Sequence, residues 1–380
     1  MSESLNKNHR TALLLGGGGA RAAYQVGVLK AIAELLPEEE KNPFPIICGT
    51  SAGSINTVAL ASNAGDFRTG VAKIIAVWSN FQLSHVFHAD TKNLFKRILG
   101  WFWSNLGLGN RDTGPSSLLD NCPLQKLLEE HISFSKIDDS IANGDLHAYC
   151  LTACSYTSGE STTFYDGHHT IGDWLRTHRE GRREKMSIDH LMASSAIPVI
   201  FPSVKIGEEN FGDGSMRQIS PISPALHLGA EKILIIGLRM EKKLRDLKEP
   251  DTSRPSLGQI SGYVLDTLFL NSLYSDLERM ERMNRTLSKS KDKAGEEALK
   301  VIEYRVVSPS KDIATIAMQH YKDLPQGFRI ALKFLGMGKG NSRRFISYLM
   351  FTSRFCTELI DLGYTDAMRD KEELIAFLAA

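Results

Sequence analysis

A serine between two glycines follows a short apolar run, and this arrangement could present a nucleophile on a sharp turn. The run Phe44–Cys48 reads FPIIC and predicts a buried strand, and Gly49-Thr-Ser-Ala-Gly53 follows it directly. Residues 54–63 then show a helical pattern, so Ser51 is expected where a strand turns into a helix. The two glycines would let both backbones approach, and the helix N-terminus favours developing negative charge. A chance match in an ordinary loop is the alternative.

Four consecutive glycines, Gly16–Gly19, follow the first apolar run of the chain and precede a helical pattern. One interpretation is a phosphate-binding loop, because Gly17, Gly19 and Ala22 fit the spacing G-x-G-x-x-G/A. A dinucleotide site would also need an acidic residue at the end of the next strand, which ends in Cys-Gly-Thr instead. The other interpretation is an oxyanion hole made by the backbone N–H groups of Gly17, Gly18 and Gly19, which the nearby serine turn favours.

A nucleophilic serine needs a base, and no histidine of this sequence has a distinctive context. Asp213, within Phe211-Gly-Asp-Gly-Ser215, follows a predicted strand in a glycine-flanked turn where its side chain could project. An Asp-Gly turn between strands explains the same residues without any chemistry. For Arg21, just after the glycine loop, anchoring of that loop, added positive potential and a salt bridge on a helix face are all compatible with the sequence.

The elements that would position these residues alternate between strands and helices. Two successive strand–turn–helix units predict an α/β fold in three layers, with a mainly parallel central sheet. Strands are predicted at residues 11–15, 44–48, 147–156, 162–165, 204–206, 232–238 and 301–307. Helices or helical patterns are predicted at residues 22–36, 54–63, 66–81, 122–131, 188–195, 256–287 and 328–379.

The composition changes at residues 241–256, a charged stretch that contains two prolines and predicts a linker or surface loop. This stretch separates an α/β core at residues 11–240 from a helical extension at residues 257–380, here called the C-terminal extension. No long flexible tether precedes the extension, so its helices are expected to pack on the core.

The overall composition is that of a globular protein, with 42% hydrophobic residues and a net charge of +1. This balance excludes a general electrostatic attraction to nucleic acid, so no nucleic-acid partner is expected. No apolar run approaches the roughly 18–20 residues that span a bilayer, and the polar N-terminus lacks a secretory apolar segment. Five cysteines, mostly within apolar stretches, favour a reduced, cytoplasmic location.

Two stretches could face a lipid surface. Residues 93–109 combine nine large apolar side chains with flanking Lys and Arg, which suits a membrane-docking segment, a lid over an acyl cleft or a core helix. Arg176–Lys185 holds five cationic residues and two glutamates. It predicts a solvated loop, with attraction to anionic headgroups as the alternative.

Three motifs, taken in this order, resemble those of the patatin-like phospholipases: the glycine loop with Arg21, Gly49–Gly53, and Asp213-Gly214. These phospholipases are serine lipid acyl hydrolases that use a Ser–Asp dyad and no metal. Three further stretches resemble parts of that family: Ala22–Leu29, Ala193–Val204 and the region near Ser347–Met368, the last of them in longer bacterial members. The family usually has Gly at position 22 and Gly or Ala at position 215, where this chain has Ala and Ser.

The resemblance implies a patatin-like hydrolase core followed by C-terminal helices, and it assigns roles to individual residues. These are nucleophile for Ser51, base for Asp213, oxyanion-hole backbone for Gly17, Gly18 and Gly19, elbow glycines for Gly49 and Gly53, and support for Arg21 and Gly214. It implies an acyl lipid substrate, no cofactor, and phospholipase A or lysophospholipase activity. A peripheral contact with the inner face of a membrane would use residues 93–109. The alternatives are a general carboxylesterase, an acyl thioesterase and a catalytically silent lipid-binding protein.

Overall fold

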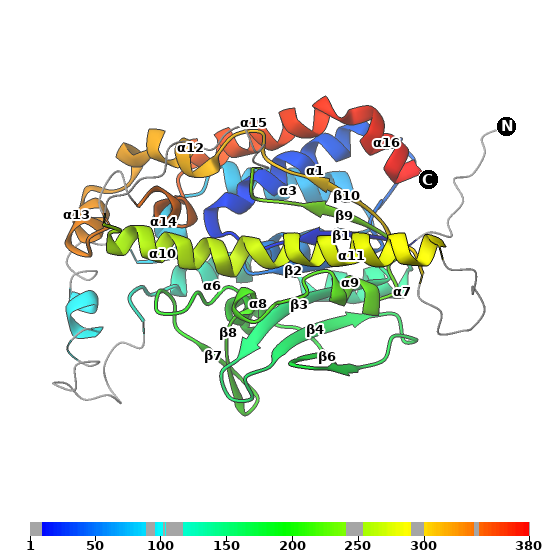
Figure 1. Ribbon diagram of the computed structural model, residues 1–380, viewed down its shortest axis with the longest axis horizontal. Coiled ribbons are helices and arrows are strands. Elements are labelled where there is room, and N and C mark those ends of the chain that lie inside the picture. The colour runs from blue at the N-terminus through cyan, green and yellow to red at the C-terminus, as the bar shows by residue number, and fades with distance from the viewer. Residues whose placement is uncertain are drawn as a thin grey trace.

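A mostly parallel β-sheet runs through the molecule and carries helices on both faces (Figure 1). The structure is a computed structural model that describes residues 10–88, 96–101, 103, 117–240, 254–289, 300–337 and 342–379. The architecture confirms the predicted α/β fold with three layers.

The strands β10, β9, β1, β2 and β3 lie side by side in this order and run parallel. Beyond β3, the sheet continues through β4, β6 and β5, and β8 pairs antiparallel with β3 and with β7. The strands are β1 (Thr11–Leu15), β2 (Ile46–Thr50), β3 (Ala148–Ser155), β4 (Ser161–Gly167), β5 (Trp174–Arg176), β6 (Arg179–Arg183), β7 (Val204–Ile206), β8 (Glu209–Asp213), β9 (Lys232–Ile236) and β10 (Glu303–Val307).

The helices of the N-terminal part are α1 (Ala23–Leu35), α2 (Ala52–Ala61), α3 (Phe67–Ser79), α4 (Leu83–Val86), α6 (Cys122–His131), α7 (Phe134–Ala142), α8 (Ile188–Ser194) and α9 (Ser223–His227). The extension contains α10 (Leu257–Asp266), α11 (Ser272–Lys289), α12 (Ile313–Gln319), α13 (Gln326–Phe334), α14 (Arg343–Tyr348), α15 (Ser353–Arg369) and α16 (Lys371–Ala379). A π-helical turn, Thr267–Asn271, joins α10 to α11. None of the described helices is both long and apolar enough to cross a membrane.

The central strands are continuous apolar runs because both of their faces are covered. Along β1, Leu13 and Leu15 pack into the larger core, to which α1, α3 and α15 contribute. Ala12 and Leu14 point the opposite way, into a smaller core that contains residues of α9 and α11. Alternate residues of one strand therefore tie both helical layers to the sheet.

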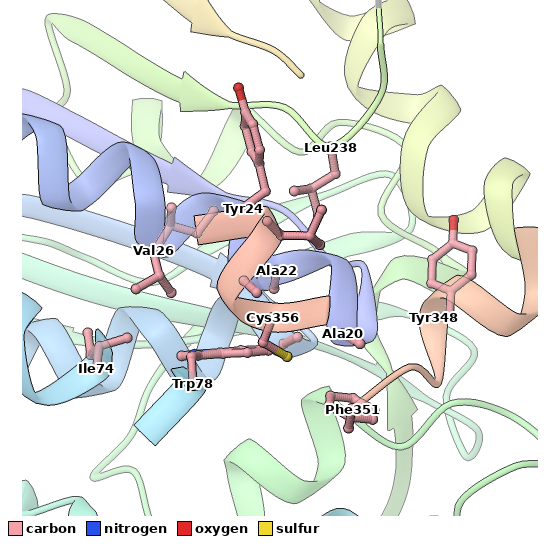
Figure 2. Close-up of a cluster of buried hydrophobic side chains, with 14 of the residues drawn as sticks. Ala20, Ala22, Tyr24, Val26, Ile74, Trp78, Leu238, Tyr348, Phe351 and Cys356 are labelled. Atoms are coloured by element: carbon pink, nitrogen blue, oxygen red, sulfur yellow. The ribbon is translucent and has the colours of Figure 1, made fainter. Parts of the chain in front are cut away.

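The C-terminal extension packs directly on the N-terminal part. Helix α15 lies along α1 (Figure 1), and the extension also adds β10, which pairs in register with β9 at the edge of the sheet. Figure 2 shows Tyr348 and Cys356 of the extension among buried side chains that include Ala22 and Trp78. The core therefore contains residues from both ends of the chain.

The prediction of a solvated loop at residues 176–185 is wrong, because this stretch forms β6 and the end of β5. Its charges are accommodated by pairing. Arg182 forms salt bridges of 2.6 Å with both Glu180 and Glu209, and Arg183 lies 3.2 Å from Asp166. Strands near the edge of a sheet tolerate such charges since one side remains open to water.

Two predicted segments fall mainly outside the described residues. Of the linker predicted at residues 241–256, only residues 254–256 are described. Of residues 93–109, the structure describes 96–101 and 103, which are helical, with Ile98 buried and Leu99 and Trp103 exposed. The docking, lid and core interpretations of that segment stay predictions.

Candidate active site

Ser51 lies at the turn between β2 and α2 in a strained backbone conformation. Its φ of 55° and ψ of −129° are rare for a residue with a side chain. The turn is fixed from both sides: the Ser51 N–H donates to Ser194 Oγ at 3.0 Å, and the Ser51 carbonyl accepts from the N–H and hydroxyl of Ser54 at 2.9 and 2.6 Å. A strained serine that is held so firmly has the geometry of a nucleophile elbow.

The glycines of this turn allow helix α2 to approach the sheet. A Cβ on Gly53 would collide with the carbonyl oxygen of Leu15, at the end of the neighbouring strand β1. Gly49 is the fourth residue of β2 and lies opposite Leu15 in the parallel register. The start of α2 therefore sits against the carboxyl ends of β1 and β2, where ligands commonly bind in open α/β sheets.

Asp213, the last residue of β8, lies on the same side of strand β3 as the Ser51 turn. Thr50 of β2 pairs with Thr152 and Asp213 pairs with Ala153, whereas β4 covers the other side of β3 at both positions. The end of β8 therefore follows directly on the end of β2, and Asp213 lies beside the Ser51 turn. The Asp213 N–H also donates to the carbonyl of Ala196 at 2.9 Å. The topology thus brings together two residues that are far apart in the sequence.

The Asp213 carboxylate is completely buried, and its two oxygens differ. Oδ1 accepts the N–H of Ser215 at 2.9 Å, whereas Oδ2 has no well-formed hydrogen bond to any described residue. Burial raises the pKa of Asp213 to about 7, and hydrogen bonding from the Ser51 side chain partly opposes that rise. The Ser51 hydroxyl is thus close enough to influence a carboxylate that can accept a proton near neutral pH.

The glycine loop lies at the end of β1, beside the Ser51 turn. Its carbonyls are used for anchoring: Gln25 Nε2 donates to Gly16 at 2.8 Å, and the Arg21 N–H donates to Gly18 at 3.1 Å. Gly19 has φ +53°, and a Cβ there would collide with the carbonyl oxygen of Tyr348. Neither of these two anchoring bonds uses an N–H group of Gly17, Gly18 or Gly19.

Arg21 points into the C-terminal extension, and every nitrogen of its buried guanidinium has a partner there. Nη1 lies 3.1 Å from Asp266, Nε donates to Ser347 Oγ at 2.8 Å, and Nη2 donates to the carbonyl of Arg344 at 3.2 Å. The guanidinium also stacks 3.9 Å from the ring centre of Tyr348. Of the roles that the sequence left open, the geometry favours anchoring of the glycine loop.

Ser51 and Gly19 line a cavity of about 130 Å³, here called the Ser51 cavity. Its walls come from α2, α3, α6 and the segment after α8, and most of its side chains are apolar. They include Ile55, Ala59, Ile74, Val77, Trp78, Phe81, Val86, Leu124, Leu127, Leu128, Ile197, Phe201 and Phe351. A hydroxyl at an apolar cavity suits an ester whose acyl part is a hydrocarbon chain.

Gly214 directly follows the carboxylate and begins a short 3₁₀ turn, Gly214–Met216, which Asp213 caps through the Ser215 N–H. Within the described residues, no group of three or more His, Cys, Asp or Glu side chains is arranged to hold a metal ion. All nine residues that the resemblance singled out thus lie at or beside one end of the sheet, with Arg21 directed away from the cavity.

Sequence reasoning missed two supporting residues, Ser194 and Asp266. Ser194 accepts the Ser51 N–H and donates to the carbonyl of Thr152 at 2.7 Å, so it links the elbow to β3. Asp266 pairs with Arg21 and accepts the Tyr348 hydroxyl at 2.9 Å. The small-residue stretch 193–204 gave a weak signal for Ser194, and no motif marked Asp266.

Comparison with known proteins gives a consistent family match. The family model described as patatin-like phospholipase matches residues 13–226. A cGAMP-activated phospholipase of Pseudomonas aeruginosa is 28% identical over 216 residues, which are 57% of this chain and 55% of that protein. A patatin-like phospholipase domain-containing protein of Caenorhabditis elegans is 26% identical over 204 residues, which are 43% of this chain and 15% of that protein.

The chain therefore spans about half the length of the first of these relatives and a smaller share of the second. Among solved structures, VipD from Legionella pneumophila aligns over 96% of this chain and 67% of that chain. The sequence identity in that alignment is 11%, and the TM-score is 0.35.

Proposed function

The chain belongs to the patatin-like phospholipase family, and from this premise we propose that it hydrolyses carboxylic esters of acyl lipids through an acyl-serine on Ser51. The observation that carries the proposal is the position of Ser51, on a strained turn between an apolar cavity and the buried carboxylate of Asp213. The cavity suits the acyl chain, and the carboxylate can take up the proton that the serine must lose.

The first half of the reaction forms the acyl-serine. As Ser51 Oγ attacks the ester carbonyl carbon, its proton moves to Asp213, and the carbonyl oxygen gains negative charge. Backbone N–H groups of Gly17–Gly19 stabilise that charge. The tetrahedral intermediate then collapses: the bond to the alcohol oxygen breaks, and the alcohol leaves with the proton from Asp213.

The second half releases the fatty acid. Asp213 accepts a proton from a water molecule as that water attacks the acyl-serine carbonyl, and the same N–H groups hold the second oxyanion. Collapse breaks the bond to Ser51 Oγ, which regains its proton from Asp213. The net reaction consumes one water and yields an alcohol and a carboxylic acid, so the enzyme returns to its starting state.

Burial of Asp213 explains how a carboxylate can replace the more common histidine base. A carboxylate with an ordinary pKa is a weak base at neutral pH, whereas the pKa of about 7 at Asp213 matches the operating range. Oδ2, which has no well-formed hydrogen bond in the described chain, provides the lone pair, because Oδ1 accepts the Ser215 N–H.

We propose (lyso)phospholipids as the substrates, as phospholipase A or lysophospholipase activity would require. The apolar walls of the Ser51 cavity support this choice, and so do the names of both relatives, which describe them as phospholipases or phospholipase domain proteins. A carboxylesterase would use the same residues on esters with shorter chains, and an acyl thioesterase would use them on thioesters. A catalytically silent lipid-binding protein would bind lipid without hydrolysing it.

The test is product analysis by mass spectrometry with purified wild-type protein and Ser51→Ala. Each protein is given phospholipid, lysophospholipid, a short-chain ester and an acyl thioester. The wild type should release fatty acid fastest from the phospholipids, and Ser51→Ala should release none above background. The assay is run with and without cGAMP, because one relative is named for activation by it. An enzyme that needs an activator is then not mistaken for a protein without activity.

Faster turnover of the thioester or the short-chain ester would favour one of the alternative enzymes. A wild-type protein that releases no fatty acid under any condition would overturn the proposed function.

A further inference from the structure

A second apolar cavity lies between the N-terminal part and the C-terminal extension. Its volume is about 310 Å³, larger than the Ser51 cavity. Helices α10, α13 and α14, which contribute to its walls, gather at one end of the molecule (Figure 1). The lining consists of Ile98, Leu118, Leu119, Pro198, Val199, Ile200, Ile260, Ser261, Val264, Leu265, Leu268, Phe328, Ala331, Leu332, Leu335, Met337, Phe345 and Leu349.

Among the described residues that line this cavity, Ser261 alone is polar, so they offer almost no partners to a polar ligand. It has a buried floor, which includes Phe328 and Leu332, and an exposed rim. On the rim, Val199, Ile260 and Val264 are 52%, 49% and 50% exposed. An open apolar cavity with an apolar rim favours a ligand that is itself a hydrocarbon.

The two cavities share a wall of only one chain thickness. In the segment after α8, Ile197 and Phe201 line the Ser51 cavity, whereas the residues between them, 198–200, line the second cavity. The segment after α14 is divided in the same way: Leu349 faces the second cavity, and Phe351 faces the Ser51 cavity. Two separate segments therefore present one face to each cavity.

The shared wall contains a second strained residue. Val199 has φ +68°, a conformation that β-branched residues almost never adopt. Leu118 N–H donates to the Val199 carbonyl at 2.9 Å, and Leu119 N–H donates to the Ile200 carbonyl at 2.8 Å. These bonds hold the strained turn in place, so Val199 stays on the rim of the second cavity. Strain maintained in this way is typical of ligand sites.

We propose that the second cavity binds the non-reacting acyl chain of a two-chain lipid while the reacting chain occupies the Ser51 cavity. The inference rests on the proposed function and deepens it, since it selects diacyl lipids over single-chain lipids. The shared wall supports this proposal, because two hydrocarbon chains that diverge from one headgroup need two apolar sites close together. A volume of 130 Å³ is similar to that of a cavity that holds benzene, so the Ser51 cavity alone buries only part of a lipid.

The test compares a two-chain and a one-chain substrate. Diacyl phosphatidylglycerol and its lysophospholipid, with the same acyl chain and in the same mixed micelles, are given to wild type and to Ser261→Phe and Ala331→Leu, which add bulk to the second cavity. Each variant should lower the ratio of diacyl to single-chain kcat/KM by roughly tenfold or more, the scale of a steric misfit in an apolar pocket.

Leu257→Phe is the matched control, because Leu257 lies exposed on the same helix as Ser261 but outside the cavity lining. It should leave the ratio within about twofold of wild type. Thermal melts show whether each variant is folded. An unchanged ratio in folded Ser261→Phe and Ala331→Leu would overturn the proposal. Reduced micelle binding with an unchanged ratio would do the same, and would identify the rim as a membrane-docking face.

A direct binding experiment keeps the two proposals distinguishable. Ser51→Ala protein is mixed with phosphatidylglycerol that carries a photoreactive diazirine in both chains, and labelled peptides are mapped after irradiation. Labels should fall on α2 or α3 for one chain and on α10 or α13 for the other. Labels on α2 and α3 alone would refute the second cavity even if the enzyme is active. Labels at both places would support it even if no hydrolysis is found.

Discussion

The polar groups around Ser51 and those around Arg21 are satisfied to very different degrees. At the Ser51 turn the backbone is strained, and the buried carboxylate of Asp213 keeps one oxygen without a well-formed hydrogen bond in the described chain. Arg21 is 4% exposed, and all three nitrogens of its guanidinium have partners in the C-terminal extension. Only a few residues of the glycine loop separate the two environments.

The difference indicates that the two regions have different roles: the region around Ser51 carries the reactive groups, and the region around Arg21 stabilises the loop beside them. Reactive groups need free lone pairs and strained geometry, both of which cost stability. A satisfied network next to them keeps the glycine loop in place. The family match ends at residue 226, so Asp266, Ser347 and Tyr348, which hold Arg21, lie beyond it. The extension is therefore expected to support the reaction without supplying a reacting group.

Asp213→Asn should produce the largest loss, because an amide cannot accept the serine proton. We expect hydrolysis to fall by roughly 10³-fold or more. The variant should still be folded, since an amide fits the same buried space. Circular dichroism and a thermal melt check this, and retained activity would show that the base lies elsewhere.

The activity of the wild type should depend on pH in the way that Asp213 dictates. The base works only when ionised, so the rate should rise about tenfold per pH unit below a pKa of about 7 and then level off. A pH–rate profile for kcat/KM measures this. A profile that is flat between pH 5 and 8 would contradict the assignment.

The activity should rise with pH, whereas the contribution of Asp213 to the stability of the fold should fall. In the unfolded chain Asp213 ionises near its ordinary pKa of 3.8, whereas in the fold burial raises that pKa to about 7. Between these values the folded state binds more protons, so the contribution of Asp213 to the free energy of unfolding falls as pH rises and is constant above about 7. The melting temperature of Asp213→Asn relative to wild type should therefore increase from pH 5 to pH 8.

Asp266→Asn tests the supporting role of the extension. Loss of its charge should loosen Arg21 and the glycine loop, and kcat should fall roughly tenfold, less than the 10²–10³-fold expected when an oxyanion donor is removed. Asp323→Asn is a suitable control: it also removes an ion-paired carboxylate of the extension, and Asp266 and Asp323 are 23% and 24% exposed. Equal effects of the two variants on kcat would mean that the Asp266 effect is general destabilisation.

Chelation should have the smallest effect, because the proposed reaction uses only protein groups and water. Activity in EDTA is expected to stay within about twofold of the untreated enzyme. Calcium added back after EDTA is the control, and an activity that disappears and returns with calcium would require a different mechanism.

Local patterns in the sequence were enough to predict the elements that carry the reactive groups. The run Thr11–Leu15 forms β1 with the bounds that its apolar pattern predicts, and Gly49–Gly53 does join a strand to a helix. These patterns can be recognised in the sequence because a buried strand accepts mainly apolar residues and a strained turn requires small ones. Asp213 was different: its glycine-flanked turn fitted a plain turn equally well, and only the resemblance to a family singled it out.

Long-range partners could not be predicted from one sequence. Ser194 is 143 residues from Ser51, and Ser347 is 326 residues from Arg21. The residues next to a serine or an aspartate in the sequence do not indicate which distant residue it will bond to in the fold. Strand β6, next to the edge of the sheet, was missed for a related reason: its charged residues look solvated until Glu209 of another strand is placed beside Arg182.

Labelling with a fluorophosphonate probe, which reacts only with an activated serine, tests most directly whether Asp213 activates Ser51. Wild-type protein should be labelled at Ser51 alone, as mapped by peptide mass spectrometry, at a rate that rises with pH through about 7. Folded Asp213→Asn should be labelled far more slowly at every pH. Labelling of a different serine, or labelling of Ser51 at equal rates in both proteins, would contradict the account.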